Sequence, residues 1–174
     1  MKNQLLTKIH DHSATVAIIG LGYVGLPLAV AFAESGFPVV GIDVDPNKVD
    51  AINQGRSYIS DIPSDRLRPL IIDHWQLNID HSPPPHLTAT TDYSILSSCD
   101  VAIICVPTPL NKTRDPDVRF LIAAGESVAQ HIHPGMLVVL ESTTYPGTTE
   151  ELLRPMLEAG MGQRGMQNDE LGSE

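Results

Sequence analysis

Short apolar runs alternate with stretches of helical periodicity along most of this chain. The apolar runs have the length of β-strands, and the stretches between them repeat apolar residues every three or four positions. This alternation is typical of βαβ units, in which helices join parallel strands. We therefore expect an α/β fold with a doubly wound parallel sheet. Its strands are predicted at residues 15–19, 39–42, 87–90, 101–106 and 137–140.

Helices are predicted between these strands. The clearest helical stripe, with apolar residues three and four positions apart, covers residues 118–132. Asp45 followed by Pro46 is a typical pair of N-cap and first helical residue, and Asp92 is a second N-cap. The other helices in the first hundred residues are expected at 24–35, 46–54, 64–72 and 92–96.

The two ends of the chain carry weaker signals. Leu5, Leu6 and Ile9 would share one side of a short leading helix within residues 1–13. Near the other end, residues 148–151 (Thr-Thr-Glu-Glu) have the sequence of a capping box, which predicts the start of a helix.

The region after this capping box is predicted to lose its regular structure. Pro155 lies well inside the expected helix, so we predict a bend or an early end there. From residue 160 the periodicity disappears, and residues 160–174 are predicted to be a disordered or non-matching tail. Residues 14–159 would then form one domain. Its sheet would end with the fifth strand and lack the last strand that a complete fold of this type normally has.

A glycine-rich sequence joins the first strand to the first long helix. Residues 20–25 read Gly-Leu-Gly-Tyr-Val-Gly, which in this position is the dinucleotide-binding fingerprint of a Rossmann-type fold. Gly20 would allow the tight turn, Gly22 the close approach of a pyrophosphate, and Gly25 the close packing of helix on strand. The N–H groups at the start of the helix would then face the phosphates.

Asp43 closes the second strand, 18 residues after Gly25. An acid at this place accepts hydrogen bonds from the ribose hydroxyls of an adenosine and repels a 2′-phosphate, so NAD is favoured over NADP. The alternative is that Asp43 is only a solvated strand end.

Polar residues also follow the fourth and fifth strands, and in a doubly wound sheet the ligand lies across the carboxyl ends of the strands. Residues 106–109 (Val-Pro-Thr-Pro) follow the fourth strand, and Thr108 could donate to a ribose or to the carboxamide of nicotinamide. Residues 141–144 (Glu-Ser-Thr-Thr) follow the fifth strand. A helix needs one cap rather than four polar residues, so helix capping alone does not account for the second segment.

Composition narrows the function classes. With 174 residues, of which 42% are hydrophobic, the chain can form the core of one domain. A net charge of −10 without a basic cluster argues against binding nucleic acid or an anionic membrane. The first residues lack the apolar core of a signal peptide, and no apolar run is long enough for a membrane span, so we expect a cytoplasmic protein.

Neither the cysteines nor the histidines form a metal motif. Cys99 and Cys105 flank and enter the fourth apolar run and are predicted to be buried, inert thiols. His131 and His133 could in principle bind a metal, but they stand next to Pro134, where a helix end or loop is expected. We assign no metal.

Three segments carry a resemblance to a known family. They are residues 20–29 (Gly-Leu-Gly-Tyr-Val-Gly-Leu-Pro-Leu-Ala), 106–109 (Val-Pro-Thr-Pro) and 141–150 (Glu-Ser-Thr-Thr-Tyr-Pro-Gly-Thr-Thr-Glu). In this order they resemble the N-terminal NAD-binding domain of the UDP-glucose/GDP-mannose dehydrogenase family, over about residues 3–159. Residues 5–9 and 55–62 are most similar to the branch that acts on UDP-N-acetylglucosamine and related N-acetyl sugars.

The resemblance implies an enzyme that oxidises the C6 hydroxymethyl group of a UDP-sugar to a carboxylate with two NAD⁺, for polysaccharide precursors. In the family a cysteine thiolate traps the intermediate aldehyde, a second hydride transfer gives a thioester, and water releases the acid. The resemblance also implies that full-length members are homo-oligomers.

The resemblance assigns roles to individual residues. The glycine turn would hold the pyrophosphate, and Asp43 and Lys48 the adenosine ribose. Residues 106–109 would contact the nicotinamide half, and Ser142 and Thr143 would line its side, with Thr143 also orienting the catalytic water. The implied cofactor-binding residues are Gly20, Leu21, Gly22, Tyr23, Val24, Gly25, Asp43, Lys48, Val106, Pro107, Thr108, Pro109, Ser142 and Thr143.

The chain departs from the family pattern in its catalytic residues. The family's nucleophilic cysteine, its lysine and asparagine partners and a Ser-Pro-Glu glutamate all lie beyond the point where this chain stops matching. Neither Cys99 nor Cys105 occupies the matching position. We therefore expect the cofactor half of an enzyme, truncated or followed by an unrelated tail, which binds NAD and has no turnover alone.

Two alternatives stay open. The chain could be a stand-alone NAD-binding or regulatory module without chemistry of its own. It could also belong to another dehydrogenase class. Short-chain dehydrogenases need Tyr-x-x-x-Lys, and no tyrosine of this chain has a lysine four positions later. A hydroxyacid dehydrogenase would need a separate substrate domain as well.

Overall fold

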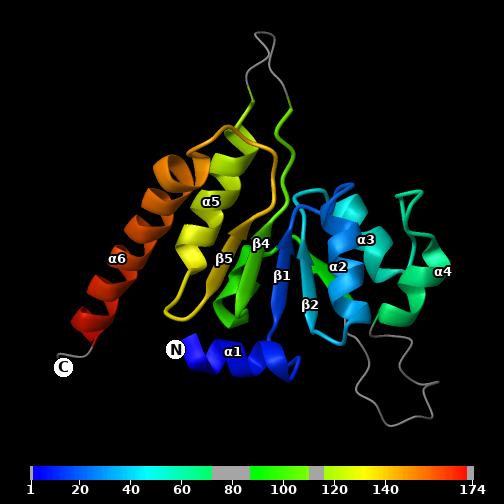
Figure 1. Ribbon diagram of the computed structural model, residues 1–174, viewed down its shortest axis with the longest axis horizontal. Helices are drawn as coiled ribbons and strands as arrows, with labels where there is room; N and C mark the ends of the chain where they lie inside the picture. Colours follow the sequence, from blue (N-terminus) through cyan, green and yellow to red (C-terminus); the bar gives the residue numbers. More distant parts are fainter. Residues whose placement is uncertain (1, 72–86, 110–115, 172–174) are drawn as a thin grey trace.

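A single parallel sheet forms the centre of the protein (Figure 1). The computed structural model describes residues 2–71, 87–109 and 116–171. The strands are β1 (Val16–Ile19), β2 (Val39–Ile42), β3 (Leu87–Thr90), β4 (Val101–Ile104) and β5 (Leu137–Leu140). They pair in parallel in the order β3-β2-β1-β4-β5. This arrangement confirms the predicted Rossmann-type fold, and β3 and β5 are the two edge strands of the described sheet.

Helices accompany these strands in the predicted alternation. They are α1 (Lys2–His10), α2 (Gly25–Glu34), α3 (Pro46–Asn53), α4 (Ser64–Leu67), η1 (Arg68–Leu70), η3 (Tyr93–Ser98), α5 (Arg119–His131), η4 (Thr148–Leu153) and α6 (Arg154–Leu171). None of the described helices is long and apolar enough to cross a membrane.

The helices cover both faces of the sheet. Successive residues of a strand point to opposite faces. Ile18 of β1 shares a buried cluster with Val30 of α2, whereas Ile19 shares another with Leu121 of α5. All four residues of β1 and all four of β4 are buried, which explains why these segments are apolar without interruption.

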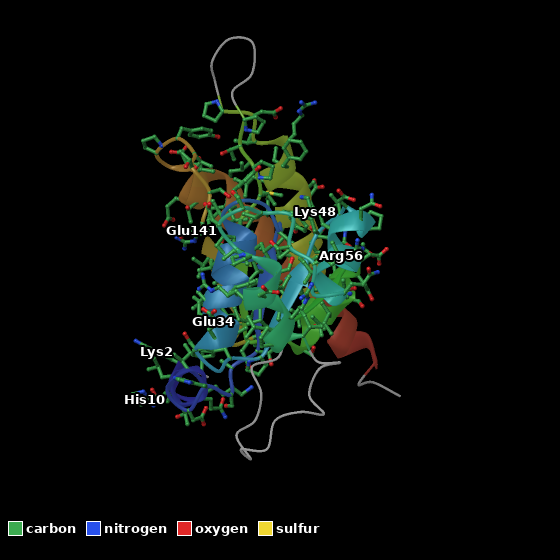
Figure 2. The ribbon with its side chains drawn as sticks, turned by 90° about the vertical axis from the view of Figure 1, so that its right-hand side faces the viewer. Lys2, His10, Glu34, Lys48, Arg56 and Glu141 are labelled. Carbon is green, nitrogen blue, oxygen red and sulfur yellow. The ribbon has the colours of Figure 1, made fainter. Side chains whose placement is uncertain are left out.

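The order of the strands determines where a ligand can lie. From β1 the chain continues to β2 on one side, and β4 lies on the other side of β1. The carboxyl ends of β1 and β4 are therefore a topological switch point, where doubly wound folds bind their ligands. Helix α1 lies at the opposite end, across the amino ends of the strands (Figure 1). Figure 2 shows Lys48 and Glu141 in the upper half of the molecule and Lys2 and His10 at its lower end.

The helix caps in the middle of the chain agree with their prediction. Asp45 accepts a hydrogen bond from the Asn47 N–H at 2.9 Å, and Asp92 accepts one from the Ser94 N–H at 2.8 Å. The predicted fourth strand is shorter than expected, because it ends at Ile104. The helix expected at 64–72 consists of α4 and the 3-10 turn η1, and residue 72 lies outside the described residues.

The start of the last helical region differs from its prediction. Gly147, with φ 91°, precedes η4, and no side chain caps this helix. The Thr148 hydroxyl instead donates to the Tyr145 carbonyl at 2.7 Å, so the predicted capping box does not form. Helix η4 has π winding and passes into α6 at Arg154, directly before Pro155. The winding changes at the proline, which has no N–H to donate, and the helix continues.

Helix α6 also runs through the region where a disordered or non-matching tail was predicted. It continues past Gly160 to Leu171. A Cβ atom at Gly160 would lie 2.2 Å from the Ala129 carbonyl oxygen of α5. This glycine therefore lets α6 approach α5 closely, whereas in the sequence it resembled the start of an irregular segment.

Candidate functional site

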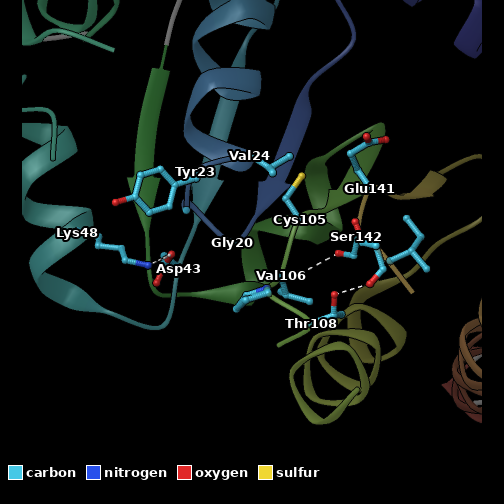
Figure 3. Close-up of a pocket in the computed structure, with 14 residues that line it drawn as sticks. Gly20, Tyr23, Val24, Asp43, Lys48, Cys105, Val106, Thr108, Glu141 and Ser142 are labelled. Atoms are coloured by element: carbon cyan, nitrogen blue, oxygen red, sulfur yellow. Dashed lines mark hydrogen bonds and ion pairs between the residues drawn. The ribbon is translucent and has the colours of Figure 1, made fainter. Parts of the chain in front are cut away.

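A cavity of about 540 Å³ opens at the carboxyl ends of the central strands (Figure 3). It is lined by Gly20, Gly22, Tyr23, Val24, Asp43, Lys48, Cys105, Val106, Pro107, Thr108, Leu140, Glu141, Ser142 and Thr143. The glycine turn after β1, the end of β2 and the loops after β4 and β5 thus meet in one place, as the switch point of the sheet predicts.

All but three of the predicted cofactor-binding residues line this cavity; the exceptions are Leu21, Gly25 and Pro109. Leu21 is fully buried, and Gly25 packs against Gly20. The Pro109 carbonyl accepts a hydrogen bond from the Asp117 N–H at 2.7 Å.

Three lining residues had no predicted cofactor contact: Cys105, Leu140 and Glu141. Leu140 is the last residue of β5, and Cys105 directly follows β4. Their position in the sequence could have predicted this contact, since residues at the carboxyl ends of these strands face the switch point. Glu141 belongs to the polar segment 141–144 that follows the fifth strand, but the sequence predicted no role for this residue.

The three glycines of the turn differ in what surrounds them. Gly20 has φ 92°, and a Cβ there would lie 2.8 Å from the Cys105 carbonyl oxygen. A Cβ at Gly25 would lie 1.8 Å from the Gly20 carbonyl oxygen. A Cβ at Gly22 would meet nothing within 4 Å. Gly20 and Gly25 are thus required by backbone packing, whereas the space beside Gly22 is open to a ligand.

Asp43 is buried, with 5% of its surface exposed, so the alternative of a solvated strand end is wrong. Its Oδ2 atom accepts hydrogen bonds from the Leu21 N–H at 2.8 Å and from Lys48 Nζ at 3.0 Å. Its Oδ1 atom accepts one from the Asp45 N–H at 3.0 Å. A carboxylate has about four acceptor positions, so roughly one is left for a ribose hydroxyl rather than the two expected from the sequence.

Two side-chain hydrogen bonds connect the loops after β4 and β5 (Figure 3). The Ser142 hydroxyl donates to the Val106 carbonyl at 2.9 Å, and the Thr108 hydroxyl donates to the Thr143 carbonyl. The Thr108 proton is therefore used within the protein, where the sequence suggested a bond to the cofactor. These bonds hold the two loops together as one wall of the cavity.

The thiols of both cysteines are buried, as predicted. Burial, together with the charge of Glu141, raises the pKa of Cys105 to about 11. Burial and the charge of Asp100 raise the pKa of Cys99 to about 11 as well. At neutral pH neither residue is a thiolate, which is the form that acts as a nucleophile.

His131 and His133 lie at the other end of the sheet. His131 is the last residue of α5, and His133 follows it with Nε2 2.9 Å from the Cys99 carbonyl oxygen. In the part of the chain that the structure describes, no group of three or more histidine, cysteine, aspartate or glutamate side chains is arranged to hold a metal ion.

A second hollow of about 320 Å³ adjoins the cavity. Gly20, Asp43, Lys48, Val106 and Pro107 line both spaces. The rest of its lining is mostly apolar and consists of Ile42, Val44, Asp45, Tyr93, Phe120, Ala123, Ala124 and Ser127. Asp43 and Lys48 thus lie where a polar and an apolar compartment meet, an arrangement that suits a nucleoside.

The fold and the site define a dinucleotide-binding Rossmann domain. The family model for the NAD binding domain of the UDP-glucose/GDP-mannose dehydrogenase family matches residues 14–171. The chain belongs to this family, and the cofactor of the domain is NAD. The match includes residues 160–171, which the structure places in α6.

Individual relatives agree with this assignment. The chain is 36% identical over 149 residues to a UDP-N-acetyl-D-glucosamine 6-dehydrogenase from Pseudomonas aeruginosa, covering 86% of this chain and 32% of that protein. It is 38% identical over 149 residues to a UDP-N-acetyl-D-mannosamine dehydrogenase from Pyrococcus horikoshii, covering 86% and 33%. The chain thus spans about a third of the length of these relatives.

Solved structures show the same likeness. An NDP-N-acetyl-D-galactosaminuronic acid dehydrogenase from Methanosarcina mazei superimposes with a TM-score of 0.75 at 30% identity, covering 92% of this chain and 34% of that one. A UDP-D-ManNAc dehydrogenase from Pyrococcus horikoshii superimposes with a TM-score of 0.72 at 38% identity, covering 85% and 32%.

Proposed function

We propose that this chain forms the NAD site of a nucleotide-sugar 6-dehydrogenase that acts on a UDP-N-acetylhexosamine. The observation that carries the proposal is a single cavity lined by residues of all three sequence motifs. The substrate class is supported by the relatives, which are named as dehydrogenases of UDP-N-acetyl-D-glucosamine and UDP-N-acetyl-D-mannosamine.

The cavity has room and partners for each part of NAD. The pyrophosphate would lie beside Gly22, at the start of α2, where helix N–H groups favour an anion. The adenosine ribose would bind the free acceptor position of Asp43 and the remaining N–H donors of Lys48. The adenine would fill the adjoining apolar hollow.

The loops after β4 and β5 would hold the nicotinamide half. The hydrogen bonds of Ser142 and Thr108 keep the two loops in register before any ligand binds, which reduces the ordering cost of binding. Thr143, on the same wall, would help to orient a water molecule. When bound, NAD⁺ supplies the hydride acceptor for oxidation of the sugar hydroxymethyl group.

The remaining catalytic groups are proposed to lie in the two thirds of the relatives' sequences that this chain does not match. The full oxidation consumes one hydroxymethyl group, two NAD⁺ and one water, and yields one carboxylate, two NADH and three protons. It needs a thiolate that can reach the sugar. Cys99 and Cys105 are buried with raised pKa values, so neither can supply it at neutral pH.

The decisive experiment is calorimetric titration of the purified 174-residue chain with NAD⁺ and with NADP⁺. We expect NAD⁺ to bind and NADP⁺ to bind about 10-fold more weakly or worse, because its 2′-phosphate would lie against the Asp43 carboxylate. No binding of either dinucleotide would contradict the proposed cofactor site. Equal affinities would contradict the role of Asp43.

The substrate class needs a separate assay of NADH formation, monitored by fluorescence. We expect no NADH from the 174-residue chain with any UDP-sugar. Any longer form of the protein that carries the catalytic cysteine should oxidise UDP-N-acetylglucosamine or UDP-N-acetylmannosamine faster than UDP-glucose or GDP-mannose. A preference for GDP-mannose would contradict the proposed substrate class and leave the NAD site untouched.

A further inference from the structure

Residues 55–62 supply no side chain to the cavity, yet one of them contacts its glycine turn. The Tyr58 hydroxyl donates a hydrogen bond to the Leu21 carbonyl oxygen at 2.6 Å, across 37 positions of sequence. The Leu21 N–H donates to Asp43 Oδ2 at 2.8 Å. Both backbone polar groups of Leu21 are therefore held by side chains from other parts of the chain.

The side chain of Leu21 is held as well. It is fully buried and lies over Gly41 of β2. A Cβ atom at Gly41 would lie only 2.8 Å from Leu21 Cδ2, so this position accommodates the leucine because it has no side chain. The centre of the glycine turn is thus fixed at three points: the N–H, the carbonyl and the side chain of Leu21.

Tyr58 itself lies on a well-supported segment. The preceding Ser57 N–H donates to the Ser64 hydroxyl at 3.0 Å. The following Ile59 is buried in the core beside α2, as is Ile62. Burial and the charges of Asp43 and Asp45 raise the pKa of Tyr58, so its hydroxyl keeps its proton at neutral pH and stays a donor.

The direction of the Leu21 carbonyl matters for an anionic ligand. In a trans peptide the carbonyl of one residue and the N–H of the next point in opposite directions. When Tyr58 holds the Leu21 carbonyl, the Gly22 N–H is therefore directed away from Tyr58. Gly22 lines the cavity, whereas Tyr58 does not. A rotated peptide would instead present a carbonyl oxygen to the pyrophosphate and repel it.

We propose that Tyr58 is a positioning residue for the cofactor, which orients the Leu21–Gly22 peptide so that its N–H faces the pyrophosphate and its carbonyl does not. This inference rests on the proposed NAD site. The proposal also explains what residues 55–62 do. Their sequence is similar to one branch of the family, but the similarity alone predicted no role for them.

The test is the variant Tyr58→Phe, which keeps the ring and removes the hydroxyl. Its affinity for NAD⁺, ADP and adenosine is compared with that of the unchanged chain by calorimetry. Loss of one neutral hydrogen bond should weaken NAD⁺ and ADP about 5- to 10-fold. Adenosine, which has no phosphate, should bind the variant and the unchanged chain equally well.

The matched control is Asp100→Ala, at the opposite end of the sheet. It removes the hydrogen bonds that Asp100 accepts from Lys8 and from the Thr15 N–H. It should lower the melting temperature without changing the affinity for any of the three ligands. Hydrogen exchange of ligand-free protein provides a second measurement: amides of residues 20–25 should exchange faster in Tyr58→Phe and at the unchanged rate in Asp100→Ala.

Each outcome decides the inference. A selective loss for the phosphate-containing ligands supports it. Unchanged affinity for ADP, or an equal loss for ADP and adenosine, overturns it, and in the second case Tyr58 has only a general structural role. If the unchanged chain binds no NAD⁺, the proposed cofactor site is wrong and this inference is wrong with it. If the unchanged chain and Tyr58→Phe bind NAD⁺ equally well, only the role of Tyr58 is wrong.

Discussion

Two cavities of the same volume, about 540 Å³, lie at opposite ends of the sheet. One lies at the carboxyl ends of the strands and is the proposed NAD site. The other lies at the amino ends, beside α1, and is lined by Gln4, Leu5, Thr7, Lys8, Asp100, His133, Pro134 and Gly135. Because the volumes are equal, size gives no reason to prefer either cavity as a binding site.

The two cavities differ in the groups that line them. In the amino-end cavity the charged groups bind one another: Lys8 Nζ lies 2.6 Å from Asp100 Oδ1, and Asp100 Oδ2 accepts the Thr15 N–H at 3.0 Å. The carboxyl-end cavity also contains an ion pair, since Asp43 Oδ2 lies 3.0 Å from Lys48 Nζ, but it adds a glycine turn with open space at Gly22. Position at the switch point of the sheet, and not volume, therefore distinguishes a binding site from a hollow between packed elements.

The largest effect is expected from Gly25→Ala. The added Cβ would lie 1.8 Å from the Gly20 carbonyl oxygen, so the turn must move away from α2. We expect the free energy of unfolding to fall by about 3 kcal/mol and NAD⁺ affinity to fall about 100-fold. Denaturant unfolding and calorimetry measure the two quantities. Normal NAD⁺ affinity in this variant would show that the cavity does not depend on the packing of the turn.

A smaller effect is expected from Asp43→Ala. It leaves the Leu21 N–H and Lys48 without their shared acceptor. NAD⁺ affinity should fall about 30-fold, and the preference for NAD⁺ over NADP⁺ should disappear. The control is Asp92→Ala, which removes a helix cap at the end of β3 and no cavity residue. If the control loses NAD⁺ affinity equally, the loss in Asp43→Ala results from reduced stability and not from a lost contact with NAD⁺.

Gly22→Ala should separate binding from folding. Its Cβ would meet nothing within 4 Å, so the melting temperature should stay the same within about 1 °C. The methyl group would take up space proposed for the pyrophosphate, and NAD⁺ affinity should fall about 10-fold. Gly162 in α6 also has no atom within 4 Å of an added Cβ and does not line the cavity, so Gly162→Ala is the matched control. Unchanged NAD⁺ affinity in Gly22→Ala would exclude the proposed path of the pyrophosphate.

These variants also show which parts of the site could be predicted from the sequence. The glycine turn and the strands carry their signal in a few consecutive residues, so their positions were predictable. The fourth apolar run continues to Val106, yet β4 ends at Ile104. The Cys105 N–H still donates to the Ile19 carbonyl of β1, but Cys105 and Val106 also line the cavity. Hydrophobicity alone does not distinguish a buried strand from a buried cavity wall.

Other features depend on contacts between distant segments. The position of Asp43 was predictable, but its bonds to Leu21 and Lys48 depend on how β1, β2 and α3 pack. The bond between Thr108 and Thr143 joins two loops 35 positions apart. In the sequence Gly160 resembled the end of a helix. In the structure it lies against Ala129 of α5, where a side chain would not fit. No local pattern distinguishes a glycine that ends a helix from one that permits close helix packing.

The smallest effect on NAD⁺ is expected at the amino-end cavity. Burial alone would raise the pKa of Asp100, but hydrogen bonds from Lys8 and Thr15 and the nearby positive charges hold it below its ordinary value. Because the folded pKa is lower than the unfolded one, this contribution to stability is complete above the ordinary value of 3.8 and disappears as the pH falls through the folded pKa.

Asp100→Asn should therefore lower the melting temperature by about 2 °C at pH 7, and the difference from the unchanged chain should shrink at pH values below about 4. NAD⁺ affinity should stay within about 2-fold of the unchanged chain, since Asp100 lies outside the carboxyl-end cavity. Melting curves over pH and one titration with NAD⁺ measure both quantities. A marked loss of NAD⁺ affinity would show that the two ends of the sheet are coupled, because the amino-end cavity would then influence a ligand that it does not contact.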